Sequence, residues 1–137
     1  MKISRTVAYA VQATLQLAQS GSEGPVPCSR LAADGHMPER FLLQVLRHLV
    51  THGILHSTRG VEGGYRLERP PEQISLLSVI EAIEGPLNAD VPGGDVNEMP
   101  CVPQLRRALQ EITASACRQL EAIKLSDLLT PDPVQVG

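Results

Sequence analysis

Three polar side chains recur on one side of a candidate helix in the first half of the chain. Arg40, Gln44 and Arg47 lie four and three residues apart, the spacing that brings side chains together on one helical face. Arginine and glutamine can both make paired hydrogen bonds to base edges, and arginine also binds phosphate. Further along, the glycine-rich segment RGVEGG (residues 59–64) begins with Arg59. A charged helix face beside a basic hairpin tip predicts a surface that binds a polyanion.

An apolar stripe on the opposite side of the same segment predicts an amphipathic helix. Its members are Phe41, Leu42, Val45, Leu46 and Leu49. Their three-and-four spacing buries one side of a helix and leaves the other free, and Pro38 and Gly53 suit its start and its end. Short strand-like runs at residues 54–55 and 65–67 flank the glycine-rich turn. One long helix followed by a glycine-tipped hairpin is typical of a winged helix-turn-helix.

Three further helices are expected around this unit. The first is capped by Ser4 and ends at Gly21. Its expected buried stripe is Val7, Val11, Leu15 and Ala18. A short second helix covers roughly residues 28–33, and another begins at Ser75, while residues 84–100 are too rich in Gly, Pro, Asn and Asp to pack as an element. The predicted fold is mainly α with a small β-hairpin.

The last helix carries a regular apolar seam that predicts a dimer. Its members are Val102, Leu105, Leu109, Ile112, Ala116, Leu120 and Ile123. Steps of three and four resemble a coiled-coil seam, and a helix of about 20 residues spans about 30 Å, longer than so small a domain needs. A second subunit is the natural cover for this seam. The alternative is that the helix folds back on its own domain.

These patterns divide the chain into four expected parts. Residues 1–87 form the winged helix-turn-helix domain, residues 88–101 a flexible loop for an effector or cluster, residues 102–129 the dimerisation helix with a terminal turn, and residues 130–137 a disordered tail. Charge also differs along the chain: residues 1–69 hold eight Lys or Arg and five acids, whereas the remainder holds four and ten. The expected binding half is therefore basic although the whole chain has a net charge of −3.

Composition excludes several classes of protein. Aromatic residues make up 2% of the chain, so no stacking platform for single-stranded nucleic acid is available. The first residues lack the layout of a signal peptide and no apolar run is long enough to span a bilayer, which predicts a cytoplasmic protein with no membrane partner. Neither a phosphate-binding loop, a nucleophile elbow nor a pair of catalytic carboxylates is present. We therefore expect a protein that is not an enzyme.

Several stretches together resemble one known family. They are SRTVAYAVQATLQLA, PVPCSRLA, PERFLLQVLRHLVTHGIL, STRGVEGGYRL and IKLSDLL. The chain is similar to the IscR-like winged-helix transcription regulators over residues 1–87 and again from about 101 to 129, and the RG and GGY of the hairpin are the most specific part. The resemblance implies a homodimer on partly palindromic double-stranded DNA, with the third helix in the major groove, the wing in the adjacent minor groove and crossed C-terminal helices.

The resemblance also implies roles for individual residues. Base-reading positions fall on Arg40, Leu43 and Gln44, where Leu43 replaces an acid found in some relatives and could touch a thymine methyl or simply edge the core stripe. Arg59 and Gly60 match the wing tip, where a narrow minor groove attracts a guanidinium. The remaining expected DNA contacts are Ser4, Arg5, Tyr9, Pro38, Glu39 and Arg47. Of these, Arg5 could equally be a solvated surface charge, and the helix start at Pro38 favours a nearby phosphate.

The resemblance fails where it would identify a cofactor. Family members with an iron–sulfur cluster carry three closely spaced cysteines in the loop after the EGP turn, whereas that loop contains only Cys101 here. A cluster needs about four ligands, and Cys28 and Cys117 lie in other segments. We therefore expect no cofactor. Regulation could come from oxidation of Cys101 or from a small-molecule or protein effector at residues 85–101.

Histidines at helical spacing raise the alternative of a metal site, against which the geometry favours surface and phosphate-side histidines. His48, His52 and His56 follow one another at intervals of four, and such a pair can hold zinc. Gly53 should end the helix before His56, and no cysteine or carboxylate lies nearby at ligand spacing. We expect no metal, and a homodimeric, sequence-specific transcription regulator. The alternative is a winged-helix module that binds a protein partner through its acidic half, with weak or vestigial DNA binding.

Overall fold

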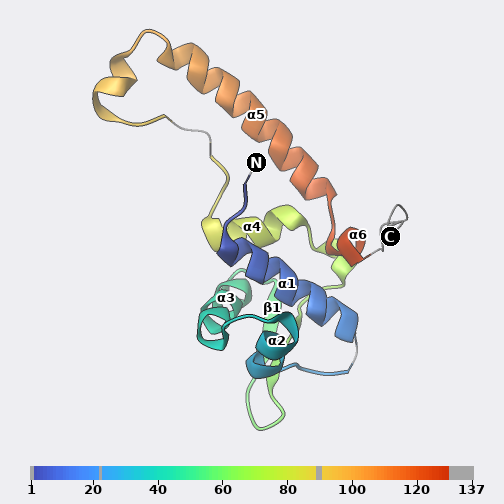
Figure 1. Ribbon diagram of the computed structural model, residues 1–137. Helices are drawn as coiled ribbons and strands as arrows, with labels where there is room; N and C mark the ends of the chain where they lie inside the picture. The colour runs from blue at the N-terminus through green and yellow to red at the C-terminus, as the bar shows by residue number, and fades with distance from the viewer. Residues whose placement is uncertain (1, 22, 89–90, 130–137) are drawn as a thin grey trace, which may run out of the picture.

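The computed structural model describes residues 2–21, 23–88 and 91–129 and confirms a mainly helical fold with one small hairpin (Figure 1). The helices are α1 (Arg5–Ser20), α2 (Cys28–Gly35), α3 (Glu39–Thr51), α4 (Leu76–Glu84), α5 (Val102–Ala122) and α6 (Leu125–Leu129). The strands are β1 (Leu55–Thr58) and β2 (Gly64–Leu67), and two 3-10 helices are η1 (Pro71–Gln73) and η2 (Gly94–Glu98). Predicted tail residues 130–137 lie outside the described part of the chain.

Helices α1, α2 and α3 form the helix-turn-helix core. Ser4 caps α1 by accepting a hydrogen bond from the Val7 N–H at 3.2 Å, which satisfies one of the free amides of the first turn. The turn between α2 and α3 is made by His36, whose φ of 55° lies in the left-handed region, while the Met37 N–H returns to the Ala32 carbonyl at 2.9 Å. This tight reversal sets α3 across α2.

The buried faces agree with the sequence for α3 and differ for α1. Four members of the predicted α3 stripe are buried, but Phe41 is 40% exposed and meets Tyr9 edge-on, with ring centroids 5.6 Å apart. In α1 the buried residues are Val7, Ala10, Ala13, Thr14 and Leu17. Val7 of the predicted stripe is buried, whereas Val11, Leu15 and Ala18 are half-buried, and Val11 and Leu15 pack against the edge of the core. Small side chains face inward because α1 packs against α3, α4 and α6 at once.

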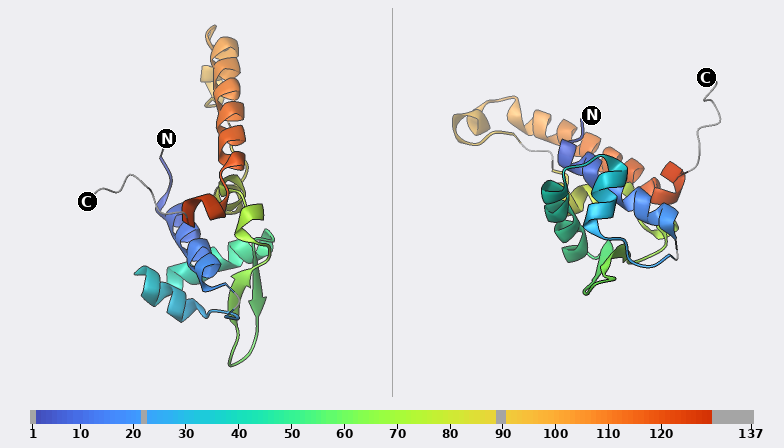
Figure 2. Two further views of the ribbon diagram at one scale, coloured as in Figure 1. Left: turned by 90° about the vertical axis from the view of Figure 1, so that its right-hand side faces the viewer. Right: turned by 60° about the horizontal axis from the view of Figure 1, so that its bottom comes forward.

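The hairpin follows α3 directly. Gly53, with φ of 75°, ends the helix, and β1 pairs antiparallel with β2 from Leu55 opposite Leu67 to Thr58 opposite Gly64. Val26 forms an isolated antiparallel bridge with Tyr65 of β2, through two backbone hydrogen bonds of 2.8 and 2.9 Å. The base of the hairpin is thus tied to the segment that precedes α2. Its loop projects at the end of the molecule opposite to α5 (Figures 1 and 2).

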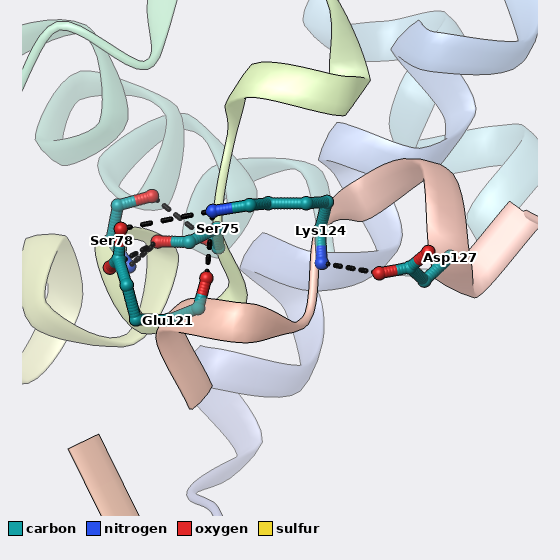
Figure 3. Close-up of polar contacts among 5 residues, drawn as sticks. All are labelled: Ser75, Ser78, Glu121, Lys124 and Asp127. Carbon is teal, nitrogen blue, oxygen red and sulfur yellow. Dashed lines mark hydrogen bonds and ion pairs between the residues drawn. The ribbon is translucent and has the colours of Figure 1, made fainter. Parts of the chain in front are cut away.

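Helix α5 leaves the domain as an arm and is anchored at its C-terminal end (Figures 1 and 2). The Leu76 N–H donates to the Ile123 carbonyl at 2.8 Å, and the Leu125 N–H donates to the Ile74 carbonyl at 2.9 Å. Side chains reinforce this anchor, because the buried Ser75 hydroxyl donates to Glu121 at 3.0 Å (Figure 3). After it, α6 returns to the domain and buries Leu125 in the main core.

Two predictions about the second half need correction. The helix ends at Ala122 and Ile123 is extended, with φ of −87° and ψ of 118°, so Ile123 is not part of a helical seam. The segment predicted to lack any element, residues 84–100, contains η2, and Asn97 in η2 accepts a hydrogen bond from Arg106 at 3.0 Å. The richness of this segment in glycine and proline did not exclude such a short element, because a 3-10 helix needs only a few residues.

Candidate nucleic-acid interface

The outward face of α3 presents the polar residues that the sequence singled out. Pro38, Glu39, Arg40, Gln44 and Arg47 are exposed, while Leu43 is half-buried among them. Leu42, Val45, Leu46 and Leu49 anchor the opposite face, each with no more than 1% exposed surface. Anchoring on one face holds the other in a fixed orientation. The helix can therefore present a row of donors and acceptors to a partner without first having to order itself.

A hollow of about 480 Å³ lies between the start of α2 and the start of α3. It is lined by Cys28, Glu39, Arg40 and Leu43. Burial, followed by the nearby Glu39 carboxylate, raises the pKa of the Cys28 thiol, so the thiol stays neutral at physiological pH. Its Sγ lies 3.7 Å from the Glu39 carbonyl oxygen, to which it donates. Leu43 and the neutral thiol form an apolar patch next to charged Arg40 on the outward face of α3, which we call the reading face.

A second hollow, of about 390 Å³, joins α3 to the hairpin. Its lining is Arg47, Val50, Thr51, Ser57 and Tyr65. Burial is the main cause that raises the pKa of the Tyr65 hydroxyl; Cys28 raises it further and Arg47 lowers it. Tyr65 therefore keeps its proton and can donate a hydrogen bond. Helix and hairpin form one continuous surface here, which is what a partner spanning both would need.

Residues predicted at the start of α1 lie close to the edge of this surface. Ser4 and Arg5 are exposed, and Ser4 is already engaged as the helix cap. Tyr9 is half-buried and its ring packs against Phe41 of α3. This contact connects the start of α1 to the start of α3. Ser4 can offer its hydroxyl to another partner only in addition to its capping bond.

The wing tip is a closed turn. The Gly63 N–H donates to the Gly60 carbonyl at 3.0 Å, and Gly60 has a φ of 110°. A side chain at Gly63 would collide with the backbone of Thr58 and Arg59, so glycine is required there for space. Arg59 is exposed at the start of this turn. The arrangement brings Arg59 and Gly60 to the end of the hairpin, as their place in the sequence predicted.

Two functional candidates escaped the sequence reasoning. Cys28 and Tyr65 line the hollows beside α3, although the sequence placed Cys28 only at the start of a short helix and Tyr65 only in a strand-like run. The signal for Cys28 was its place one residue after Pro27 at the start of the helix that crosses α3. The signal for Tyr65 was its place as the second residue of the strand GYRL, where it pairs with Val26. Neither signal identifies a neighbour across the fold.

The histidines and cysteines do not assemble into a ligand set. The His52 ring Nδ1 lies 2.8 Å from the His48 carbonyl oxygen, and His56 pairs with Glu68 at 3.4 Å. Cys101 is exposed, whereas Cys28 and Cys117 are half-buried in other elements. Within the described residues, no group of three or more His, Cys, Asp or Glu side chains is placed to hold a metal ion.

The arm formed by α5 keeps only the ends of its predicted seam within its own chain. Val102 and Leu120 are 1% and 9% exposed. Leu120 packs against Val7 and Ile80 in the intrachain core, whereas Val102 is buried at the other end of α5, where the helix contacts η2. Between them Leu105 and Ile112 are 44% and 65% exposed. An apolar hollow of about 360 Å³ is lined by Ile112, Ser115, Ala116, Gln119, Leu120 and Ile123. Leu109 and Ala116 are half-buried.

A helix-turn-helix with an exposed polar helix and an adjoining hairpin defines the winged-helix class of DNA-binding proteins. Comparison with known families places the chain more closely, because residues 3–131 match Rrf2, which is described as an iron-dependent transcriptional regulator. The chain belongs to the Rrf2 family. A proposed HTH-type transcriptional regulator of Mycobacterium tuberculosis is 36% identical over 130 residues, or 93% of this chain and 81% of the relative.

Solved structures agree with this placement. CymR, the global cysteine regulator of B. subtilis, has a TM-score of 0.77 and 29% identity, covering 94% of this chain and 96% of CymR. IscR of T. potens has a TM-score of 0.72 and 32% identity, covering 94% and 86%. These relatives are transcription regulators, so this chain is a bacterial-type DNA-binding transcription regulator, as the sequence predicted. Among the described residues, no helix is both long and apolar enough to cross a membrane.

Proposed function

We propose that this protein binds specific operator DNA as a homodimer, with α3 in the major groove and the hairpin in the adjacent minor groove. The observation that carries the proposal is the continuous surface that joins the exposed face of α3 to the hairpin through the hollow at Arg47 and Tyr65. A major groove about 12 Å wide admits one helix. The hairpin then extends along the duplex toward the next groove.

Different residues of this surface would do different work. Arg40 and Gln44 are exposed on one face of α3, where an arginine can pair with guanine and a glutamine with adenine. Leu43, beside the neutral Cys28 thiol, offers an apolar contact for a thymine methyl. Arg5 and Arg47 would bind phosphate and set the register without reading sequence. The exposed Glu39 carboxylate could accept from a cytosine amino group on the same side as Arg40.

The second subunit would cover the middle of α5. Leu105 and Ile112 expose apolar surface on an arm that is anchored to its own domain at its C-terminal end and contacts η2 at the other. An antiparallel copy of the same arm would bury both residues and the apolar hollow beside Ile112. A two-fold axis at this contact would present two copies of α3, which fits a partly palindromic operator.

The cysteines do not fit an iron–sulfur cluster, although the family is described as iron-dependent. A cluster needs about four ligands, usually thiolates. Cys101 is exposed and directly precedes α5, whereas Cys28 lines the hollow beside α3 and Cys117 lies toward the anchored C-terminal end of α5. We therefore propose a regulator that works without a cluster and takes its signal from an effector at residues 85–101 or from oxidation of the exposed Cys101.

Selection of bound fragments from random DNA at low salt tests the proposed function. The expected result is a partly palindromic sequence bound by a dimer, with an affinity that falls steeply as salt rises because each neutralised phosphate releases counterions. Sedimentation of the purified protein without DNA measures dimerisation separately from DNA binding. Failure to retain any sequence would contradict the proposal and favour a module that binds a protein partner through its acidic half.

A further inference from the structure

The wing tip carries an acid where a polyanion is expected to lie. Val61 and Glu62 occupy the two corners of the turn closed by the Gly60–Gly63 hydrogen bond. Val61 is 106% exposed and Glu62 is also exposed. With glycine on both sides of the pair, Val61 and Glu62 have no side chain at the tip to fold against apart from each other. Both side chains must therefore project beyond Arg59, at the end of the hairpin.

The Glu62 carboxylate has no hydrogen-bond or ion-pair partner among the residues that the structure describes. A carboxylate is acceptor-only. The minor groove presents acceptors on every base pair, namely adenine N3 and thymine O2 on A·T pairs, and the only donor on its floor is the 2-amino group of guanine. An A-tract, which has a narrow groove and a strong negative potential, would therefore repel Glu62.

We infer that Glu62 selects a G·C pair beneath the wing by accepting a hydrogen bond from the guanine 2-amino group. The inference rests on the proposed docking of the hairpin in the minor groove, and it names the feature of the groove that the tip recognises. Arg59 alone would favour a narrow A-tract. Glu62 stands further out on the same turn, reverses this preference, and leaves Arg59 to bind the phosphates at the rim of the groove.

The test uses the selected operator duplex with single-base replacements. Inosine in place of guanine removes the 2-amino group but keeps the O6 and N7 that are read in the major groove. At one position under each wing, inosine should weaken binding of the wild-type dimer about tenfold, the effect of a hydrogen bond to a charged group. Glu62→Ala should bind the guanine and inosine duplexes equally well. Glu72→Ala, which removes an exposed acid in η1, is the matched control and should keep the full inosine penalty.

Several results would overturn the inference while leaving operator binding intact. These are an operator with no G·C pair inside the wing footprint, no inosine penalty at any position, or the same penalty in Glu62→Ala as in the wild type. Uniformly tighter binding of Glu62→Ala to every duplex would show simple repulsion instead of recognition, and would also overturn it. A protein that retains no DNA sequence at all refutes the docking itself, and with it both proposals.

Discussion

Placing a charge at Ile112 should dissociate the dimer without unfolding the subunit. Ile112 is 65% exposed within its own chain, so about a third of its side chain is covered there. Full burial of such a side chain stabilises a fold by about 1.5–3 kcal/mol, and Ile112→Glu should therefore lower the free energy of unfolding of one subunit by only about 0.5–1 kcal/mol. The thermal midpoint should change by a few degrees.

The cost in the dimer is much larger because each copy would bury an unpaired carboxylate. An uncompensated buried charge costs about 3–5 kcal/mol, and two-fold symmetry gives two such charges in each dimer. Dimer affinity should fall by at least about 10⁴-fold at 1.4 kcal/mol per factor of ten. Sedimentation equilibrium measures the dissociation constant, and operator binding should be lost in parallel.

Two variants on the same helix control this experiment. Glu111→Gln changes an exposed neighbour and should leave both the dimer and the fold unchanged. Leu120→Glu places the charge in the intrachain core, where Leu120 is 9% exposed, and should unfold the subunit itself. If Ile112→Glu still sediments as a wild-type dimer, the proposed interface on α5 is wrong.

Other predictions concern the reading face, the first helix, the thiols and iron. Gln44→Ala and Arg40→Ala should each lose about 1–3 kcal/mol of discrimination at particular bases, whereas Arg5→Ala should weaken all sequences equally; a uniform loss in all three, measured by competition binding, contradicts the assigned roles. Ser4→Ala should lower the free energy of unfolding by about 0.5–2 kcal/mol, measured by urea denaturation, and no change would mean that the cap is redundant. Because the pKa of Cys28 is raised in the fold, the stability that this supplies is present at neutral pH and is lost as pH rises through the alkaline range; Cys28→Ala should remove that part of the pH dependence. Protein purified without oxygen should be colourless and iron-free, and stoichiometric iron and sulfide lost in Cys101→Ala would overturn the absence of a cluster.

Strong, locally encoded signals predicted α3 and the hairpin. In α3 the large side chains Leu42, Leu46 and Leu49 mark the buried face, and Gly53 marks the end, so one short stretch of sequence contains the whole argument. In the first helix the predicted stripe marks only the edge of the buried face, because the centre of that face uses Ala10, Ala13 and Thr14, which pattern analysis counts as weakly apolar. Close packing of several elements needs small side chains, and that requirement depends on the tertiary structure.

The candidate site shows the same limit. Exposed Arg40, Gln44 and Arg47 were predictable because one helical face contains them all. Phe41 was assigned to the core because it adjoins the stripe, yet its position at the stripe's edge lets it pack on Tyr9 at the surface. The contribution of Cys28 to the reading face depends on how α2 crosses α3, which no periodicity within either helix encodes. Likewise, periodicity identified the α5 stripe but not which of its members its own domain covers.

Because α5 is fixed to the domain at one end, a small rotation there becomes a larger displacement at the other end. Two backbone hydrogen bonds and the Ser75–Glu121 contact fix one end of the arm to the domain, while η2 lies at its far end (Figure 1). Because 21 helical residues extend about 30 Å, a tilt of about 6° at the anchor moves the far end by about 3 Å. In a dimer joined through the arms, the same tilt shifts the two copies of α3 against each other. Half-sites about 34 Å apart tolerate little change of that kind, so in the proposed dimer a small event at the loop would be amplified into loss of register on DNA.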